Sequence, residues 1–310
     1  MSSVDNTNPN ALAELSSHLS DAVDRAASYI VAIHARRRIP SSGVMWRDGV
    51  IVSASHTVRR DGTVRLTLPD GNNAEATVVG RDAVTDLVVL RAPDLALAAA
   101  PRAESRASAV GSLVLAVGRP GRNVSASFGI VSAVREGWRT ETGERIEGLL
   151  RLDLAVYDGF SGGPLVAPSG AVVGINNSAF ARGAGAALPA PVVDSVVDEL
   201  LTRGHMRRPF IGVGVHPVAV GAAAARRYNL PHEVALIVVS LAEGEPADAA
   251  GMQLGDLLVG IADQPLGRPA DLRDALSNVP DGASIELAVL RGGTQQTIRV
   301  TPRDRGGHTE

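Results

Sequence analysis

One short stretch constrains this chain more than any other, the run Gly159-Phe160-Ser161-Gly162-Gly163-Pro164. Glycines on both sides of a serine favour a tight turn in which the hydroxyl is exposed and neighbouring backbone N–H groups converge. Acyl transfer needs this pairing, because a nucleophile must act together with donors aimed at the oxygen that becomes negative. The same residues are also compatible with a glycine-rich turn that has no chemical role, so the rest of the sequence must decide.

The pattern also fits Gly-x-Ser-x-Gly, the nucleophile elbow of α/β-hydrolases, which requires a helix directly after the serine. Instead, Pro164 is followed by two short apolar runs, 165–167 and 171–176, that flank a Pro-Ser-Gly turn. This order predicts a strand, a turn and another strand, so the elbow is excluded by its context. What remains is the order histidine, aspartate, serine along the chain, with both partners upstream of Ser161.

His56 is the candidate general base, because it ends an apolar, β-prone run and a strand end can present an imidazole to a cleft. Only two other histidines precede Ser161. His18 lies in an amphipathic helical pattern, and His34 precedes the basic run 36–38, which we interpret as a solvated strand end.

Asp86 is the candidate aspartate. It opens the apolar strand 87–90, where its carboxylate would stay anchored and ionised beside an imidazole N–H. Asp82 is the nearest competitor, but it belongs to the polar turn before that strand and we expect it to face water.

At this point the chain resembles the HtrA (Deg) family of trypsin-like serine proteases. His56 and Asp86 are 30 residues apart, and Asp86 and Ser161 are 75 residues apart, which is similar to the family's arrangement. The resemblance runs from about residue 25 to the end of the chain. Its motifs follow one another in order: Ser42-Gly43-Val44, 48–53, 85–90, Gly129-Ile130-Val131-Ser132, Asp153 with 159–164, and Gly174-Ile175-Asn176.

The resemblance implies that His56 is the general base, that Asp86 orients it and that Ser161 is the nucleophile. It also implies an oxyanion hole formed by the backbone N–H groups of Gly159 and Ser161, and no metal or cofactor. Phe160 departs from the family, which has a small polar residue before the nucleophile. We expect its ring to point away from the substrate while biasing the turn between a formed and a collapsed oxyanion hole.

The resemblance also locates a substrate pocket. The residue six positions before the nucleophile is acidic in relatives that cut after Lys or Arg, and here it is Ala155. We assign Ala155, Ile175 and Asn176 to this pocket. Its aliphatic surroundings offer no countercharge to a basic side chain, so cleavage is expected after small or medium aliphatic residues.

Beyond Arg207-Arg208-Pro209, about 95 residues resemble the PDZ domain of the same family. The resemblance implies that Phe210-Ile211-Gly212-Val213 forms the loop whose N–H groups hold a peptide's terminal carboxylate. An extended peptide would add as a strand beside it, with its last side chain in an apolar pocket. We expect Phe210, Val213 and Leu272 or Leu276 to line that pocket. A small α+β domain that only packs on the protease is the alternative.

Composition excludes several classes of protein. The chain has 310 residues and no cysteine, so disulfides, thiolate chemistry and Cys-type zinc sites are excluded. Its net charge of −3 offers no electrostatic footprint for nucleic acid. The polar start 1–10 lacks a signal-peptide pattern, and no apolar run approaches the ~20 residues of a membrane span. From these absences we expect a cytoplasmic location, or an exported one if the N-terminus has been trimmed.

The predicted fold class is mostly β, a chymotrypsin-like double β-barrel followed by a small α+β PDZ domain. The expected divisions are an N-terminal tail and helix at 1–28, the trypsin-like protease domain at 29–204, the PDZ domain at 205–304 and a tail at 305–310. Helices are expected over 11–28, 192–204 and 270–278. Since relatives form trimers through their N-terminal segments, Leu12–Tyr29 is the candidate interface of a homo-oligomer.

The predicted function is an HtrA-type serine endopeptidase that degrades unfolded or misfolded proteins, with a PDZ domain that binds C-terminal peptides. The expected partners are therefore unfolded polypeptides and C-terminal peptides, without nucleic acid. The alternative is a catalytically weak or silent peptide-binding or chaperone-like scaffold of the same fold.

Overall fold

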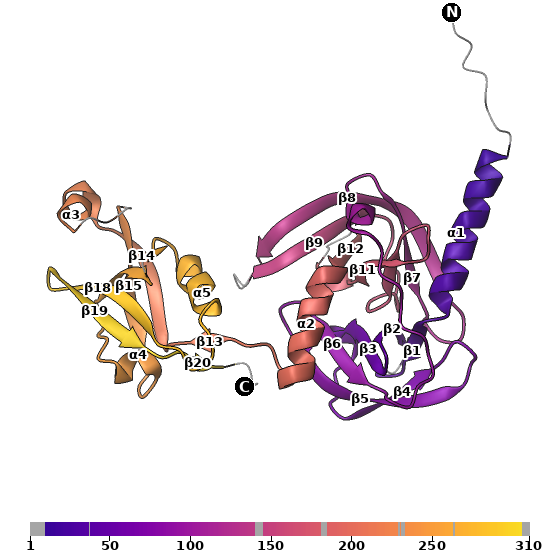
Figure 1. Cartoon of the computed structure of the whole chain (residues 1–310), viewed down its shortest axis with the longest axis horizontal. Helices are drawn as coiled ribbons and strands as arrows, with labels where there is room; N and C mark the ends of the chain where they lie inside the picture. The colour runs from indigo at the N-terminus through magenta and orange to yellow at the C-terminus, as the bar shows by residue number, and fades with distance from the viewer. Residues whose placement is uncertain are drawn as a thin grey trace, which may run out of the picture. The chain divides into compact units, whose positions relative to one another are not determined.

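The computed structural model describes residues 10–36, 38–139, 145–180, 185–228, 230, 233–262 and 264–305. The chain divides into two compact units, residues 1–206 and 207–310 (Figure 1). Three segments named in the sequence analysis lie partly outside the described residues: the N-terminal decapeptide, the basic run at 36–38 and the C-terminal tail from residue 306 onward.

The first unit contains two closed antiparallel barrels, which confirms the predicted double β-barrel. The first barrel has the strand order β1-β2-β3-β6-β5-β4. Its strands are β1 (Ile30–Ile33), β2 (Ser41–Arg47), β3 (Val50–Ala54), β4 (Thr63–Thr67), β5 (Asn73–Asp82) and β6 (Leu87–Arg91). A short 3₁₀ helix, η1 (Ser55–Thr57), follows β3 directly.

The second barrel has the order β10-β11-β12-β9-β8-β7. Its strands are β7 (Leu113–Gly118), β8 (Ser125–Arg139), β9 (Arg145–Asp153), β10 (Pro164–Val166), β11 (Val172–Asn176) and β12 (Gly185–Pro189). Two 3₁₀ helices, η2 (Ser105–Ser108) and η3 (Ser178–Phe180), precede β7 and follow β11. The strand, turn and strand predicted after Ser161 are therefore confirmed as β10 and β11.

Burial along the strands follows their place in the barrels. Every residue of β1, β3 and β11 is buried, because these strands are covered on both faces. In β4, which has a face open to solvent, exposed and buried positions alternate at its start. The apolar core formed in this way holds rigidly the strand ends from which the candidate site is built.

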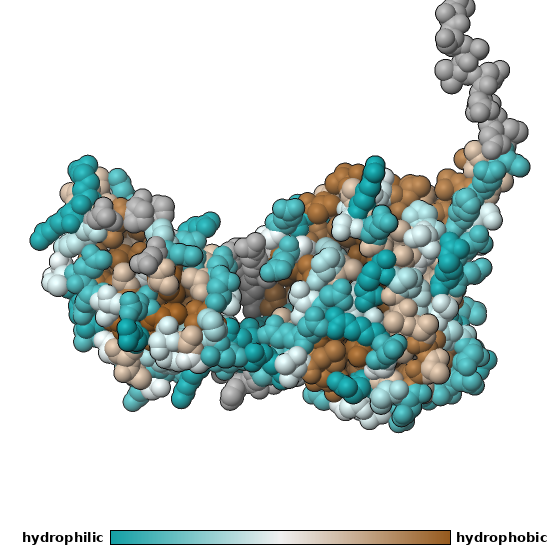
Figure 2. Space-filling model, viewed as in Figure 1, coloured by the Kyte–Doolittle hydropathy of each residue, from teal (hydrophilic) through white to brown (hydrophobic). Residues whose placement is uncertain are grey.

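Helix α1 (Ala11–Ala27) precedes the first barrel, as the helical spacing of its leucines predicted. Only its C-terminal part is anchored: Ala22 and Ala26 are fully buried, whereas Leu12 is 82% exposed. The N-terminal half therefore extends beyond the barrels (Figure 1), and most of its visible face is hydrophilic (Figure 2). In the same view hydrophobic residues gather over β8, where Phe128 and Val134 are about half exposed.

Helix α2 (Ala190–Arg203) lies across strands of both barrels, β5, β6 and β11 (Figure 1). Its buried face, which includes Val193, Val197 and Leu200, joins the main core, as predicted. The helix ends at Gly204, whose left-handed conformation lets its N–H reach the Leu200 carbonyl. The barrels are thereby fixed to one another by a helix as well as by their own contacts.

The second unit is an antiparallel sheet with helices, which confirms the predicted α+β unit. The sheet order is β14-β15-β16-β18-β19, with β17 beside β16, and β13 pairs separately with β20. The strands are β13 (Pro209–Phe210), β14 (Val213–Ala219), β15 (Val234–Leu241), β16 (Leu257–Ile261), β17 (Gln264–Pro265), β18 (Ile285–Arg291), β19 (Thr294–Val300) and β20 (Arg303–Asp304). The helices are α3 (Gly221–Arg227), α4 (Pro246–Ala249) and α5 (Pro269–Ser277).

Candidate active site

His56 lies in the 3₁₀ turn η1, directly after the buried strand β3. Its backbone N–H donates to Asp86 Oδ1 at 2.7 Å, and the N–H of Ser55 donates to the Asp86 carbonyl, also at 2.7 Å. The turn is therefore tied to Asp86 through the backbone as well as through side chains. Its imidazole is 29% exposed, so one edge of the ring remains open to a substrate.

Asp86 holds the imidazole in one orientation. Its Oδ2 lies 2.5 Å from His56 Nδ1 and also accepts a hydrogen bond from Asn177 Nδ2 at 2.9 Å. Because Nδ1 is engaged by the carboxylate, the other ring nitrogen, Nε2, remains available for a proton transfer. Asp86 adopts a φ of +53°, which is unfavourable for a residue with a side chain, and such backbone strain is typical of functional sites.

Asp82 does not face water, and the expectation that it would is wrong. It is only 3% exposed, and its carboxylate accepts hydrogen bonds from the N–H groups of Val84 and Thr85 and from the Thr85 hydroxyl. The physical reason is that the turn between β5 and β6 has backbone N–H groups to which this carboxylate serves as the acceptor. Asp82 thus closes the turn that presents Asp86.

Ser161 lies in a tight turn between β9 and β10. The turn is closed by hydrogen bonds from the Phe160 N–H to the Tyr157 carbonyl and from the Gly163 N–H to the Phe160 carbonyl. Gly162 has a φ of +84°, and a Cβ there would lie 2.3 Å from Ser53 Oγ. Glycine is required because the turn packs directly against the first barrel, which brings the serine to the strand end that carries His56.

The Ser161 hydroxyl is bonded to a residue that sequence reasoning missed. Its Oγ lies 2.8 Å from Ser178 Oγ and 3.3 Å from the Ser178 backbone nitrogen. Among the described residues, it makes no hydrogen bond with His56. Ser178 directly follows Asn177, which binds Asp86, so Asp86 and Ser161 are bonded to one short segment after β11, and His56 is linked to it through Asp86. The only sequence signal for this segment is a pair of polar residues directly after an apolar strand.

The N–H groups of Gly159 and Ser161 make no hydrogen bond within the described part of the chain, so both are available to an oxyanion. The position of Gly159 is set by Ser42, which is fully buried. Ser42 Oγ donates to the Gly159 carbonyl at 2.6 Å and accepts from the Arg119 N–H at 2.7 Å. This buried serine was not singled out for the site from the sequence.

Phe160 points away from the site, as expected. Its side chain is 1% exposed and joins the core of the second barrel, where the ring meets Tyr157 edge-on at 5.5 Å between centroids. A Cβ on Gly118 would lie 2.7 Å from the Phe160 ring, so close packing holds the ring there. Phe160 is therefore part of the support of the turn.

The three residues assigned to the substrate pocket lie in different surroundings. Ala155 is exposed, and its carbonyl accepts a hydrogen bond from Ser127 Oγ. Ile175 is fully buried in the core. Asn176 is also fully buried, and its Nδ2 donates to the Pro164 carbonyl while its Oδ1 has no hydrogen-bond partner among the residues that the structure describes. The structure does not bring Ile175 and Asn176 to the surface beside Ala155, and their role in substrate binding stays a prediction.

In the second unit, β14 is an edge strand and α5 lies near it and β13. Gly212, directly before β14, has a φ of +85°, and a Cβ there would lie 2.5 Å from Glu245 Cβ. Ile211, Leu272 and Leu276 are almost fully buried in one core, with Val213 packed against it. Phe210 lies in β13 and is partly buried, with the guanidinium of Arg305 4.4 Å from its ring centroid.

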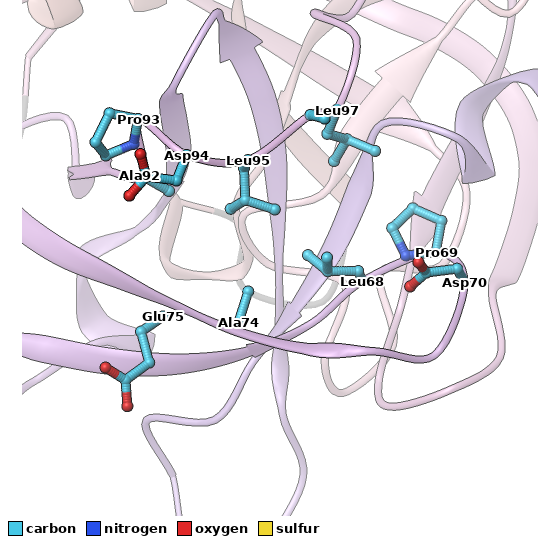
Figure 3. Close-up of a pocket in the computed structure, with 11 residues that line it drawn as sticks. Leu68, Pro69, Asp70, Ala74, Glu75, Ala92, Pro93, Asp94, Leu95 and Leu97 are labelled. Carbon is cyan, nitrogen blue, oxygen red and sulfur yellow. The ribbon is translucent and has the colours of Figure 1, made fainter.

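A pocket of about 530 Å³ lies elsewhere on the first unit, between the β4–β5 turn and the segment after β6 (Figure 3). Leu68, Leu95 and Leu97 point towards its interior, whereas the carboxylate of Glu75 points away. None of the candidate catalytic residues lines it. Among the described residues, no helix is long and apolar enough to cross a membrane.

Comparisons with known proteins agree with this geometry. Residues 41–175 match the family described as a trypsin-like peptidase domain, and residues 209–301 match the PDZ domain. A probable periplasmic serine endoprotease, DegP-like, of Brucella suis biovar 1 (strain 1330) is 33% identical over 290 residues, covering 88% of this chain and 55% of the relative. A protein of the same name from Pseudomonas savastanoi pv. phaseolicola (strain 1448A / Race 6) is 32% identical, covering 82% and 53%. The chain thus spans about half the length of these curated relatives.

Solved structures give the same picture. The serine endoprotease from Yersinia pestis superposes with a TM-score of 0.74 at 27% identity, covering 92% of this chain and 97% of that one. The HtrA-type protease AlgW with tripeptide has a TM-score of 0.72 at 25% identity, covering 94% and 98%.

The expected cytoplasmic location is contradicted, because these curated relatives are named periplasmic. That expectation rested on the lack of a signal-peptide pattern near residue 1. Signal peptides are removed from mature proteins and take no part in the fold, so their absence carries no information on location.

The matches to both domains, the relatives named DegP-like and the superposed structures agree with the fold and with the ordered motifs of the sequence. The chain belongs to the HtrA family, as a trypsin-like peptidase domain followed by one PDZ domain.

Proposed function

We propose that the chain is a serine endopeptidase in which Ser161 is the nucleophile, His56 the general base and Asp86 the residue that orients the base. The observation that carries this proposal is that Asp86 and Ser161 are both bonded to the Asn177–Ser178 segment, while Asp86 is also bonded to His56 Nδ1. The names of the relatives support it.

The reaction follows from this geometry. His56 Nε2 takes the proton of Ser161 as its Oγ attacks the carbonyl carbon of the peptide bond. The carbonyl oxygen becomes negative and is stabilised by the N–H groups of Gly159 and Ser161. His56 then donates the proton to the leaving amine, and the acyl-enzyme is hydrolysed by water that His56 activates in the same way.

A fluorophosphonate probe tests this proposal directly, because it labels only an activated serine. We expect labelling at Ser161, and we expect Ser161→Ala to lose cleavage of casein by about 10⁴- to 10⁶-fold without loss of folding. Ser169→Ala is the matched control, since Ser169 is an exposed serine in the β10–β11 turn. Equal casein cleavage by both variants would remove Ser161 from its role.

A silent scaffold is the second candidate function. It is favoured by one observation, that the Ser161 hydroxyl is bonded to Ser178 and not to His56. Absence of labelling in a folded protein that still binds unfolded polypeptide would support this alternative.

We propose further that the PDZ domain binds C-terminal peptides along the edge strand β14, with the carboxylate near Gly212. The edge position of β14 supports strand addition. Phe210, Val213 and the α5 leucines are proposed to shape the pocket for the last side chain. Because Leu272 and Leu276 are buried in the core, they would form the inner wall of this pocket.

The remaining proposals concern the whole protein. Unfolded polypeptides are the proposed substrates, and the compartment named for the relatives, the periplasm, is the proposed location. A homo-oligomer is proposed through the segment Leu12–Tyr29, supported by the exposure of Leu12 and Leu15. We also propose domain boundaries at residues 28, 204 and 304, in addition to the division of the chain into two compact units.

A further inference from the structure

The Ser178 side chain is bonded to the hydroxyl on which a base would have to act, that of Ser161. Its Oγ lies 2.8 Å from Ser161 Oγ, and its N–H points to the same oxygen at 3.3 Å. Ser161 is 5% exposed, whereas Ser178 lies at the surface. The nucleophile is therefore covered by a residue that faces solvent.

The turn that carries Ser178 is held firmly by its neighbour. Asn177 is fully buried, and its side chain makes two hydrogen bonds: Nδ2 donates to Asp86 Oδ2 at 2.9 Å, and Oδ1 accepts from the Ala179 N–H at 2.8 Å. The backbone N–H of Asn177 also donates to the Ala186 carbonyl. The position of Ser178 is thus fixed relative to the carboxylate that orients His56.

This contact competes with the first step of acyl transfer. In the orientation bonded to Ser178, Ser161 makes no hydrogen bond with His56 among the described residues, and the Ser178 N–H occupies a lone pair of the oxygen that must attack. Proton transfer to His56 requires hydrogen-bond reach between Ser161 and the base, so Ser161 must leave this orientation first.

We propose that Ser178 is a positioning residue that holds Ser161 in a resting orientation away from His56, and that release of this bond precedes acylation. The inference rests on the proposed protease function. It explains why Ser161 lies at the site of His56 and Asp86 without being bonded to the imidazole. A peptide substrate that displaces the η3 turn would release the nucleophile.

The test compares the rate constant of fluorophosphonate labelling at Ser161 in four full-length proteins: wild type, Ser178→Ala, Ser178→Thr and the control Ser169→Ala. Removing one competing hydrogen bond should speed labelling about 2- to 10-fold in Ser178→Ala. Ser178→Thr retains the hydroxyl and should label at the wild-type rate, as should Ser169→Ala. Because Ser178 does not titrate, the gain should be the same at every pH from 6 to 9.

Each outcome decides the question. If the wild type is labelled as fast as Ser178→Ala, or faster, the inference is overturned but the proposed function is not. The same holds if Ser178→Thr is accelerated as much as Ser178→Ala. A gain confined to part of the pH range would assign the effect to a group that titrates and would overturn the inference too. No labelling in any folded variant would refute the proposed function, and the inference with it.

Discussion

Gly159→Ala is the substitution that tests the oxyanion hole most sharply. Gly159 has a φ of +87°, which costs a residue with a side chain about 1–2 kcal/mol. A Cβ there would lie 2.7 Å from Pro120 Cβ and 2.9 Å from the Pro40 carbonyl oxygen. Overpacking against such neighbours costs a further ~1–3 kcal/mol. The turn must therefore shift, and its two N–H groups with it.

The matched control is Gly71→Ala. Gly71 has nearly the same φ, +86°, but a Cβ there would meet nothing within 4 Å. It should carry the cost of the backbone strain alone, so its unfolding midpoint should fall by about 2–8 °C with activity intact. Gly159→Ala should lower the midpoint at least twice as far.

The assay is kcat/KM on a peptide substrate together with thermal unfolding. Loss of one oxyanion donor costs about 10²–10³-fold in kcat, and we expect a loss of that size in Gly159→Ala. If Gly159→Ala keeps kcat within about threefold of Gly71→Ala, the backbone N–H of Gly159 does not stabilise the transition state and the assignment fails.

Four further outcomes are expected. Asp86→Asn should fold but favour the wrong imidazole tautomer, so its kcat/KM on a peptide substrate should fall sharply; a kcat/KM close to the wild-type value would contradict the role of Asp86 in orienting His56. Products mapped by mass spectrometry should end in small or medium aliphatic residues because Ala155 offers no countercharge, and a majority ending in Arg or Lys would refute this. In titration calorimetry, peptides with an apolar C-terminal residue should bind the PDZ domain with a Kd of about micromolar or weaker and should lose binding on C-terminal amidation. Equal binding by amidated peptides would rule out the carboxylate loop. Burial alone would raise the pKa of Asp256, but its hydrogen bonds, chiefly from Arg291, hold that pKa below its ordinary value. Because the pKa of Asp256 is depressed in the folded protein, the stability that its carboxylate confers is present above about pH 4 and is lost as the pH falls. Amide exchange in β16 and β18 should show this loss in the wild type, and an equal loss in Asp256→Asn would contradict the prediction.

The sequence alone determined the architecture, because local patterns encode it. Alternating apolar runs separated by turn residues predicted both barrels, and helical spacing predicted α1 and α2. The candidate residues His56, Asp86 and Ser161 were also found in this way, since each stands at the end of an apolar strand or in a glycine turn. Such signals are local, so one sequence is enough to find them.

Tertiary structure decided what those residues touch. Residues far apart in the chain meet only after the barrels close, so the bonds of Ser178 to Ser161 and of Ser42 to Gly159, across 17 and 117 positions, had no local signal. Asp82 shows the same limit. Its polar neighbours predicted exposure to solvent, but its carboxylate is buried and accepts three hydrogen bonds from donors in its own turn. Hydrogen-bond partners depend on register and packing, which the pattern of residue types does not specify.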